Sequence, residues 1–225
     1  MAAAEPGLVR YRSMPRLPHI AVAAALIVSL GLLAACTSAP SSVVPSPQPA
    51  DTATQTAGPS VNIVTGKGDI TIALDGTKAP KTVANFVKLI RAGFYDGLLI
   101  HRVEPGFVVQ AGDPLTKGVG SKELLAILAR REAGAPASGD PVIGSGGPGW
   151  TIPFERNDLV HDRGVIAMAR LQDPDSAGSQ FYITLAPAHP LDGDYVVFGK
   201  VTQGMEVVDA LAVGDKIVSA TVTED

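Results

Sequence analysis

The stretch LIHRVEPGFVVQAGDP, residues 99–114, places an arginine in an otherwise apolar, strand-like run just before a Pro-Gly turn. A guanidinium is permanently charged and offers five N–H donors in a rigid planar fork. Two interpretations of Arg102 remain open from the residues alone: an exposed salt bridge, or a cation set in a shallow apolar pocket. Val108 and Gln110 are two positions apart, so they face the same side of a strand.

Other chemistry finds little support in the sequence. No suitably patterned Ser or Cys accompanies His101, so we expect a packed or backbone-bonded histidine rather than a base. His161 and His189 are isolated along the chain, and no HExxH or CxxC spacing occurs, so neither a metal site nor a cofactor is expected. The Gly-rich run GSGGPGW, residues 144–150, lacks the Lys-Ser/Thr of a phosphate-binding loop and is interpreted as a loop beside a substrate groove.

The charge balance argues against nucleic-acid binding. The formal net charge is −4, and without residues 1–35 it becomes −6, because 15 Lys and Arg then stand against 21 Asp and Glu. No basic block remains to replace the counterions of a phosphate backbone.

The N-terminal residues 1–35 are typical of a signal peptide. Three arginines between positions 10 and 16 precede an apolar run from Ile20 to Leu33, which is too short for a comfortable membrane span. The run ends in LAAC, which resembles a lipobox, with cleavage before Cys36 and lipid attachment to its sulfur. An ordinary signal peptide is the alternative. We therefore expect a bacterial lipoprotein, anchored at the extracytoplasmic face of the cell membrane.

Residues 36–60 are expected to form a disordered tether behind the lipidated Cys36. The segment 37–60 contains five prolines, five serines and a single charged residue, with no apolar periodicity. Such a composition cannot bury a core, so the folded part would stay close to the membrane surface.

From Val61 onward the pattern changes to short apolar strands between Gly- and Pro-containing turns. Alternation about a GKGD turn predicts a hairpin over 61–74. Six further strand-like runs follow: 97–103, 106–112, 164–170, 180–186, 195–201 and 216–222. Helical periodicity occurs within 78–93 and 204–214. The pattern predicts a mainly β fold, a closed eight-stranded antiparallel barrel capped by two helices.

An insertion, about 116–142, interrupts the domain 61–225. Its segment SKELLAILARREAG predicts one surface helix, with Ser121 as N-cap and Gly134 as its stop. The apolar positions of this helix share one face: Leu124, Ile127 and Leu128.

Several separate motifs occur in a consistent order: HRVEPGFVVQAGD, GGPGWTIPFE, GVIAMAR followed by SAGSQFYI, and LDGDYVVFGKV. Together they resemble the cyclophilin-type peptidyl-prolyl cis-trans isomerases, over residues 61–222 apart from the insertion. The resemblance implies the eight-stranded barrel with two helices. It also implies acceleration of X-Pro bond rotation, and the signal sequence adds the expectation that the substrates fold outside the cytoplasm.

The resemblance implies a site, residue by residue. Arg102 corresponds to the family's catalytic arginine, Phe107 to the phenylalanine under the proline, and Gln110 to the glutamine that orients both arginine and substrate. The positions that correspond to further substrate-binding residues are Val108, Ala169, Arg170, Gln180, Tyr182, Leu191 and Tyr195.

Some of these positions depart from the common family pattern. Arg170 replaces an asparagine, and Tyr182 replaces a phenylalanine, so that an extra hydroxyl leaves the depth of the proline pocket open. Pro190 stands where many members carry a tryptophan that contacts cyclosporin, which predicts weak cyclosporin inhibition without loss of isomerase activity. The 121–133 helix is expected to narrow or extend the groove that receives residues preceding proline.

Two functions of different classes remain open. The first is an isomerase, in which the arginine favours the twisted imide over the planar one. The second is a chaperone or scaffold module that holds proline-containing segments with little turnover. Proline-containing polypeptides are the expected partners in both cases, and a monomer is the default expectation.

Overall fold

A computed structural model of the chain describes residues 58–223. The predicted signal peptide, Cys36 and almost all of the tether lie outside the described residues, so these predictions stay predictions. Within residues 58–223, no helix is both long enough and apolar enough to cross a membrane.

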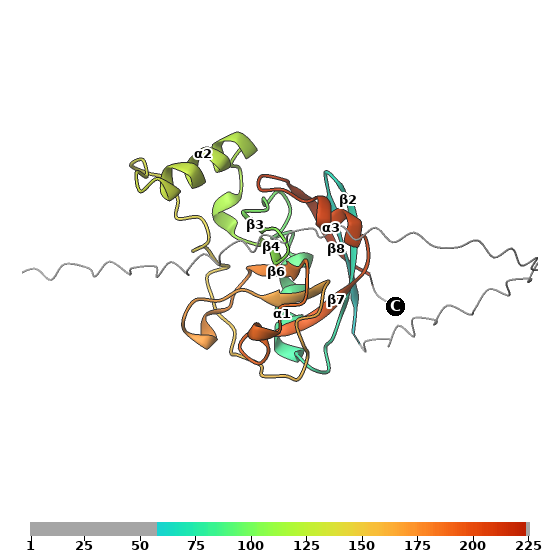
Figure 1. Cartoon of the computed structure of the whole chain (residues 1–225). Coiled ribbons are helices and arrows are strands. Elements are labelled where there is room, and N and C mark those ends of the chain that lie inside the picture. The colour runs from blue at the N-terminus through green and yellow to red at the C-terminus, as the bar shows by residue number, and fades with distance from the viewer. Residues whose placement is uncertain (1–57, 224–225) are drawn as a thin grey trace, which may run out of the picture. The chain divides into compact units, whose positions relative to one another are not determined.

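Within residues 58–223, eight strands are present, as predicted, together with three α-helices (Figure 1). The strands are β1 (Ser60–Thr65), β2 (Gly68–Leu74), β3 (Arg102–Glu104), β4 (Val108–Ala111), β5 (Val165–Met168), β6 (Phe181–Thr184), β7 (Val197–Gln203) and β8 (Ile217–Thr223). The helices are α1 (Pro80–Arg91), α2 (Ser121–Glu132) and α3 (Met205–Ala210).

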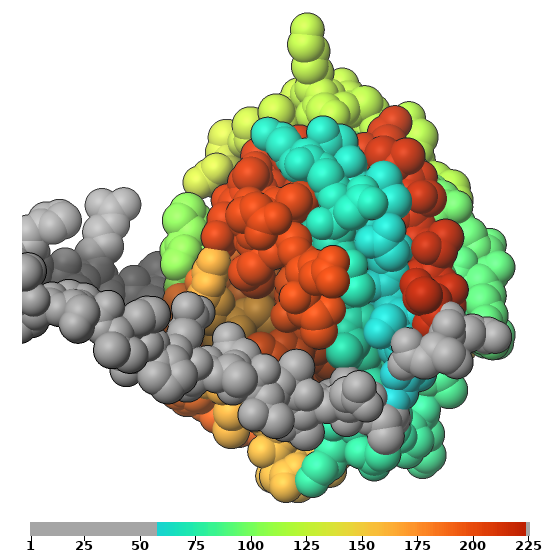
Figure 2. Space-filling model, turned by 90° about the vertical axis from the view of Figure 1, so that its right-hand side faces the viewer, coloured from blue at the N-terminus to red at the C-terminus, as the bar shows by residue number. Residues whose placement is uncertain are grey.

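The strands form one antiparallel sheet in the order β3-β4-β6-β5-β7-β2-β1-β8. Figure 2 shows one side of it, where the blue-green β1 and β2 lie between the orange-red and red C-terminal strands. The prediction of a closed barrel is wrong, because the edge strands β3 and β8 share no ladder and the sheet is a curled half-barrel. β3 has only three residues before Pro105, which has no N–H to extend a ladder.

The two edges nevertheless meet just before β3 and β8 begin. The Ile100 N–H donates to the Asp215 carbonyl at 2.8 Å, and the Ile217 N–H donates to the Leu98 carbonyl at 2.9 Å. These backbone bonds hold the curl of the sheet, and so fix where β3 lies.

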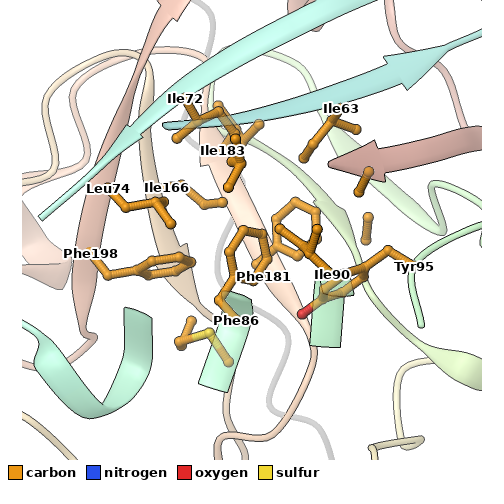
Figure 3. Packing of buried hydrophobic residues seen from close by; sticks show 14 of the residues in the cluster. Ile63, Ile72, Leu74, Phe86, Ile90, Tyr95, Ile166, Phe181, Ile183 and Phe198 are labelled. Carbon is orange, nitrogen blue, oxygen red and sulfur yellow. The ribbon is translucent and has the colours of Figure 1, made fainter. Parts of the chain in front are cut away.

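The main core fills the inside of the curl. Phe86 of α1 packs its ring against Phe181, Phe198 and Tyr95, with centroid separations of 5.1 to 5.4 Å (Figure 3). The predicted apolar face of α1 is buried as expected. α1 begins at Pro80, and the Glu155 carboxylate accepts hydrogen bonds from the first backbone N–H groups of the helix. α3 adds Val208 to the same core, so both predicted regular helices pack on the sheet.

The insertion carries one helix, as predicted, to one side of the sheet (Figure 1). Its N-cap is Gly120 rather than Ser121, which is the first residue of the helix and donates its hydroxyl to the Gly214 carbonyl at 2.6 Å. Leu124 and Ile127 are buried in a small separate cluster with Leu99. This small apolar cluster therefore attaches the insertion to the rest of the domain.

Candidate active site

The face of the sheet opposite the main core carries a second apolar cluster. Along β4 and β6, side chains alternate between the two faces: Val108 and Tyr182 belong to the second cluster, whereas Val109 and Phe181 belong to the core. The members of the second cluster are Phe107, Val108, Leu159, Val165, Ala167, Ala169, Tyr182, Leu191, Tyr195 and Val197. Six predicted site residues therefore gather in one place on the outer face; we call this cluster the slot.

Strand register aligns the polar and apolar parts of the site in one row. One residue on each of β3, β4, β6, β5 and β7 pairs with a residue on the next strand of the sheet. The row runs, in order, through Arg102, Gln110, Tyr182, Ala167 and Val197. The sheet thus brings the cation and the slot side by side.

Arg102 combines both interpretations that its sequence context left open. Its Nε lies 3.5 Å from a Glu104 carboxylate oxygen, and both side chains are about half exposed. An exposed pair of this kind contributes little free energy. Its guanidinium carbon also lies 6.0 Å from the centre of the Phe107 ring. Its Nη1 donates to the side-chain oxygen Oε1 of Gln110 at 3.4 Å. The cation therefore stands at the edge of the slot, loosely held and able to reach a ligand.

A short chain of amide hydrogen bonds fixes Gln110. Its Nε2 donates to the Gln180 side-chain oxygen at 3.0 Å, and Gln180 in turn donates to the Gly146 carbonyl at 2.8 Å. Because the amide of Gln110 is oriented from behind, its oxygen is turned toward Arg102. Gln110 and Gln180, two of the predicted site residues, are therefore joined directly by a side-chain hydrogen bond.

A cleft of about 420 Å³ adjoins the slot at this amide chain. Gln110, Ala169, Arg170 and Gln180 line it together with Gly144, Ser145, Gly146, Gly147, Gly149, Trp150, Thr151, Leu171, Ser176, Gly178 and Ser179. The predicted loop 144–150 therefore borders the groove, as expected. No residue of α2 lines the cleft, and the prediction that this helix narrows or extends the groove stays a prediction. The helix reaches only the base of the loop, where Arg131 donates to the Ile143 carbonyl at 3.1 Å.

Asp113 holds this loop, and the sequence did not single it out. Its buried carboxylate accepts hydrogen bonds from the backbone N–H groups of Leu115 and Gly144. Gly146 approaches the same carboxylate so closely that a Cβ there would lie 2.1 Å from an Asp113 oxygen. Glycine at position 146 thus has a packing reason. The Asp-Pro pair at 113–114 was the available signal, since Asp before a turn often caps backbone groups.

Tyr182 keeps its extra hydroxyl out of the slot. The hydroxyl lies 2.9 Å from His161 Nε2, within the protein, so only the ring faces the apolar cluster. Burial raises the pKa of Tyr182 far above its usual value, so the hydroxyl stays protonated. At Tyr182 the slot is therefore lined by the aromatic ring and not by the hydroxyl.

Arg170 lies half-buried at the rim between slot and cleft. Its guanidinium stacks 4.7 Å from the Tyr195 ring centre and donates to the backbone carbonyls of Asp194, Leu171 and Gln172. The cation thus fixes Tyr195 against the rim of the slot. It also places a positive charge beside a cleft that has no acidic lining residue.

The histidines differ from expectation in two respects. His161 is isolated only in the sequence: its Nδ1 lies 2.8 Å from Asp192, which also binds His189. His101 is buried, as predicted, but neither ring nitrogen has a hydrogen-bond partner among the described residues. Burial lowers the pKa of His101, which favours the neutral ring. Across residues 58–223, no group of three His, Cys, Asp or Glu side chains is placed to hold a metal ion.

Sequence reasoning missed His161 and Asp192, because they are 31 positions apart and no local pattern joins them. The ten predicted site residues of the folded part all lie in the slot, in the amide chain or at the rim between slot and cleft. The predicted lipidation site, Cys36, lies outside the described residues.

Comparison with known proteins points to one family. The family model described as "Cyclophilin type peptidyl-prolyl cis-trans isomerase/CLD" matches residues 60–224. A peptidyl-prolyl cis-trans isomerase of Synechococcus elongatus is 39% identical over 163 residues, which cover 72% of this chain and 94% of that protein. Peptidyl-prolyl cis-trans isomerase B of Bacillus subtilis is 42% identical over 139 residues, 61% of this chain and 78% of that protein.

The fold has solved relatives. A crystal structure of a Cryptosporidium parvum cyclophilin type peptidyl-prolyl cis-trans isomerase, determined in the presence of the dipeptide Ala-Pro, superposes with a TM-score of 0.58 at 26% identity. The match covers 74% of this chain and 99% of that one.

Proposed function

The chain belongs to the cyclophilin type peptidyl-prolyl cis-trans isomerase family, and from this premise we propose that Arg102 and the slot beside it accelerate X-Pro rotation in proteins outside the cytoplasm. The chain is a peptidyl-prolyl cis-trans isomerase. The observation that carries the assignment of residues is the cross-strand row that starts at Arg102 and continues into the slot.

The reaction breaks no covalent bond. Rotation about the peptide C–N bond meets a barrier of about 20 kcal/mol, because the nitrogen lone pair is delocalised into the carbonyl. At the twisted transition state this delocalisation is lost, and the proline nitrogen becomes a hydrogen-bond acceptor. Arg102 can donate to that nitrogen from the edge of the slot, and a donor that acts only in the twisted state raises turnover rather than affinity.

The slot holds the proline ring while the bond turns. Phe107, Val108 and Leu191 offer apolar surface, and the Tyr182 ring closes one side. Burying an aliphatic ring of this size contributes about 1.5–3 kcal/mol to binding. The ring is thereby anchored, so that the preceding carbonyl is the part that rotates.

The cleft receives the peptide on the side that precedes proline. Five of its lining residues are glycines, which let an extended chain approach the backbone closely, and Gln110 lies both in the cleft lining and beside the arginine. Peptide backbone in the cleft can therefore be held by the same amide that orients Arg102. Proline-containing polypeptides are the substrates that this arrangement fits. The neighbour that was crystallised with Ala-Pro supports this choice of ligand.

We further propose that the mature protein is a monomer tethered to the membrane through a lipid on Cys36. The basic start, the apolar run to Leu33 and the LAAC sequence support this assignment. A single acyl chain gives only marginal membrane binding, so more than one chain would be required for a stable anchor.

The experiment that tests the isomerase proposal compares two neighbouring substitutions in a prolyl-peptide isomerisation assay of residues 37–225. Arg102→Ala should lower kcat/KM by about 100-fold or more, as expected for loss of a preorganised transition-state donor. Glu104→Gln removes only the exposed salt bridge and should change kcat/KM by less than about threefold. Equal losses in the two variants would show that Arg102 acts through the salt bridge. Unchanged turnover in Arg102→Ala would favour a proline-binding module instead.

A further inference from the structure

A fully buried histidine stands behind the slot. His161 has no exposed surface, and it belongs neither to the slot nor to the lining of the cleft. Both of its ring nitrogens are engaged: Nδ1 lies 2.8 Å from an Asp192 oxygen, and Nε2 lies 2.9 Å from the Tyr182 hydroxyl. The ring thus bridges a carboxylate and a slot side chain.

The proton positions along this bridge follow from its partners. The backbone N–H of His161 donates to Asp192 at 2.7 Å, and this bond is the main reason that the pKa of Asp192 is lowered. A charged carboxylate requires a donor, so Nδ1 of His161 carries the proton. Nε2 is then an acceptor, and the Tyr182 hydroxyl donates to it.

The bridge connects two walls of the slot. Tyr182 forms one wall, and Asp192 directly follows Leu191, which forms another. The chain around His161 is joined to the same turn a second time, because the Ala188 N–H donates to the His161 carbonyl at 2.7 Å. His161 therefore sits where a single side chain sets the distance between the two walls.

We infer that His161 is a positioning residue for the isomerase. By accepting a hydrogen bond from the Tyr182 hydroxyl, it keeps the only polar atom of that side chain out of the slot and holds the ring against the proline. It acts through Tyr182 and does not touch the substrate, because the buried histidine lies on the far side of the tyrosine hydroxyl. This inference rests on the proposed use of the slot for proline.

Two substitutions test the hydrogen bonds of the two imidazole nitrogens separately. In His161→Gln the side-chain amide reaches the position of Nε2, so an oxygen can still accept from Tyr182. In His161→Asn the amide reaches only the position of Nδ1, so the bond to Asp192 can survive while the hydroxyl loses its acceptor. A buried hydroxyl without a partner is costly and must find water or turn into the slot.

The test measures kcat and KM for a prolyl peptide, and thermal unfolding, on the full chain. His161→Asn should raise KM about tenfold with little change in kcat, because a hydroxyl in the slot weakens binding of substrate and transition state alike. His161→Gln should raise KM by less than about threefold. His189→Asn is the matched control: it also removes a histidine from Asp192 but has no contact with Tyr182, and it should leave KM within about twofold.

Repeating the His161→Asn substitution in a Tyr182→Phe variant distinguishes a positioning role of His161 from a purely structural one. When Tyr182 is already phenylalanine, the hydroxyl is gone, and adding His161→Asn should raise KM by less than about twofold further. The inference is overturned if His161→Asn and His161→Gln raise KM equally, or if the effect of His161→Asn persists in the Tyr182→Phe background. Failure of the proposed function would look different, because the unsubstituted protein would then show no isomerase activity.

Discussion

Arg102 works because its charge is permanent and its partners are weak. The nearest carboxylate, on Glu104, lies in an exposed pair, and the hydrogen bond to Gln110 is long at 3.4 Å. A substrate nitrogen therefore competes only with water and with loosely held groups for the guanidinium. The sequence identified this arginine and the residues around it, because the HRVEPGF and VVQAGD motifs keep them close along the chain.

Activity should be nearly independent of pH between about pH 7 and 9. Arg102 does not lose its proton in this range. Burial raises the pKa of Tyr182 above its usual value, so the Tyr182 side chain stays uncharged as the pH rises. A profile of kcat/KM against pH checks this prediction. A fall of tenfold toward pH 9 would show that a titrating group takes part.

Pro190 predicts weak inhibition by cyclosporin. It is exposed in the short turn that carries Leu191, at the place where many family members have a tryptophan. An aromatic side chain there would add apolar contact surface, which Pro190 lacks. Inhibition curves of the isomerase reaction should therefore show no nanomolar inhibition, and Pro190→Trp should lower the inhibitory concentration by about tenfold. Nanomolar inhibition of the unsubstituted protein would contradict this interpretation.

At the scale of elements, strand register builds the site. Alternation along the sequence correctly predicted that Val108 and Gln110 share a face, and eight strands were found where eight were expected. Strand order could not be predicted in the same way, because β6 lies between β4 and β5 although β5 precedes it in the chain. The contact of Gln110 with Tyr182, and the link from His161 to Asp192, therefore needed the structure.

The insertion should influence substrate choice through the loop it supports. Arg130 of α2 makes two hydrogen bonds with Asp140, at 2.9 and 2.7 Å, just before the loop that lines the cleft. Asp140→Ala should loosen this loop and raise KM about threefold for peptides extended before proline, but not for short ones. The measurement is a comparison of KM across a peptide length series.

The control for this prediction is Glu123→Ala. Glu123 also binds Arg130, at 3.2 Å, but it lies on α2 itself and does not lead into the loop. It should leave the length dependence unchanged. A length-independent effect of Asp140→Ala would mean that the insertion matters for stability rather than for substrate choice.

At the scale of the whole molecule, one apolar cluster stabilises the fold and the other forms the proposed binding site. The main core surrounds α1 and stabilises the sheet, whereas the slot lies on the opposite face, where Phe107, Leu191 and Tyr195 are only partly buried. Composition and periodicity were enough to predict this mainly β class. They were not enough to predict that the sheet does not close into a barrel. Closure would require β3 to pair with β8, and β3 has only three residues.

Membrane attachment is the prediction that belongs to the full chain. We expect the mature protein to begin at Cys36 and to carry lipid on its sulfur, and Cys36→Ala should release the protein from the membrane fraction. Mass spectrometry of the mature N-terminus and fractionation of cells check both statements. An unmodified Cys36 in a protein that still fractionates with membranes would contradict the proposed anchor.

The measurement that tests the central claim most directly is magnetisation exchange between the cis and trans forms of a prolyl peptide bound at saturation. It reports the rotation rate on the protein separately from affinity. We predict that Arg102→Ala slows exchange of the bound peptide by about 100-fold while peptide affinity changes by less than about threefold. Exchange at an unchanged rate in the bound Arg102→Ala variant would contradict the account.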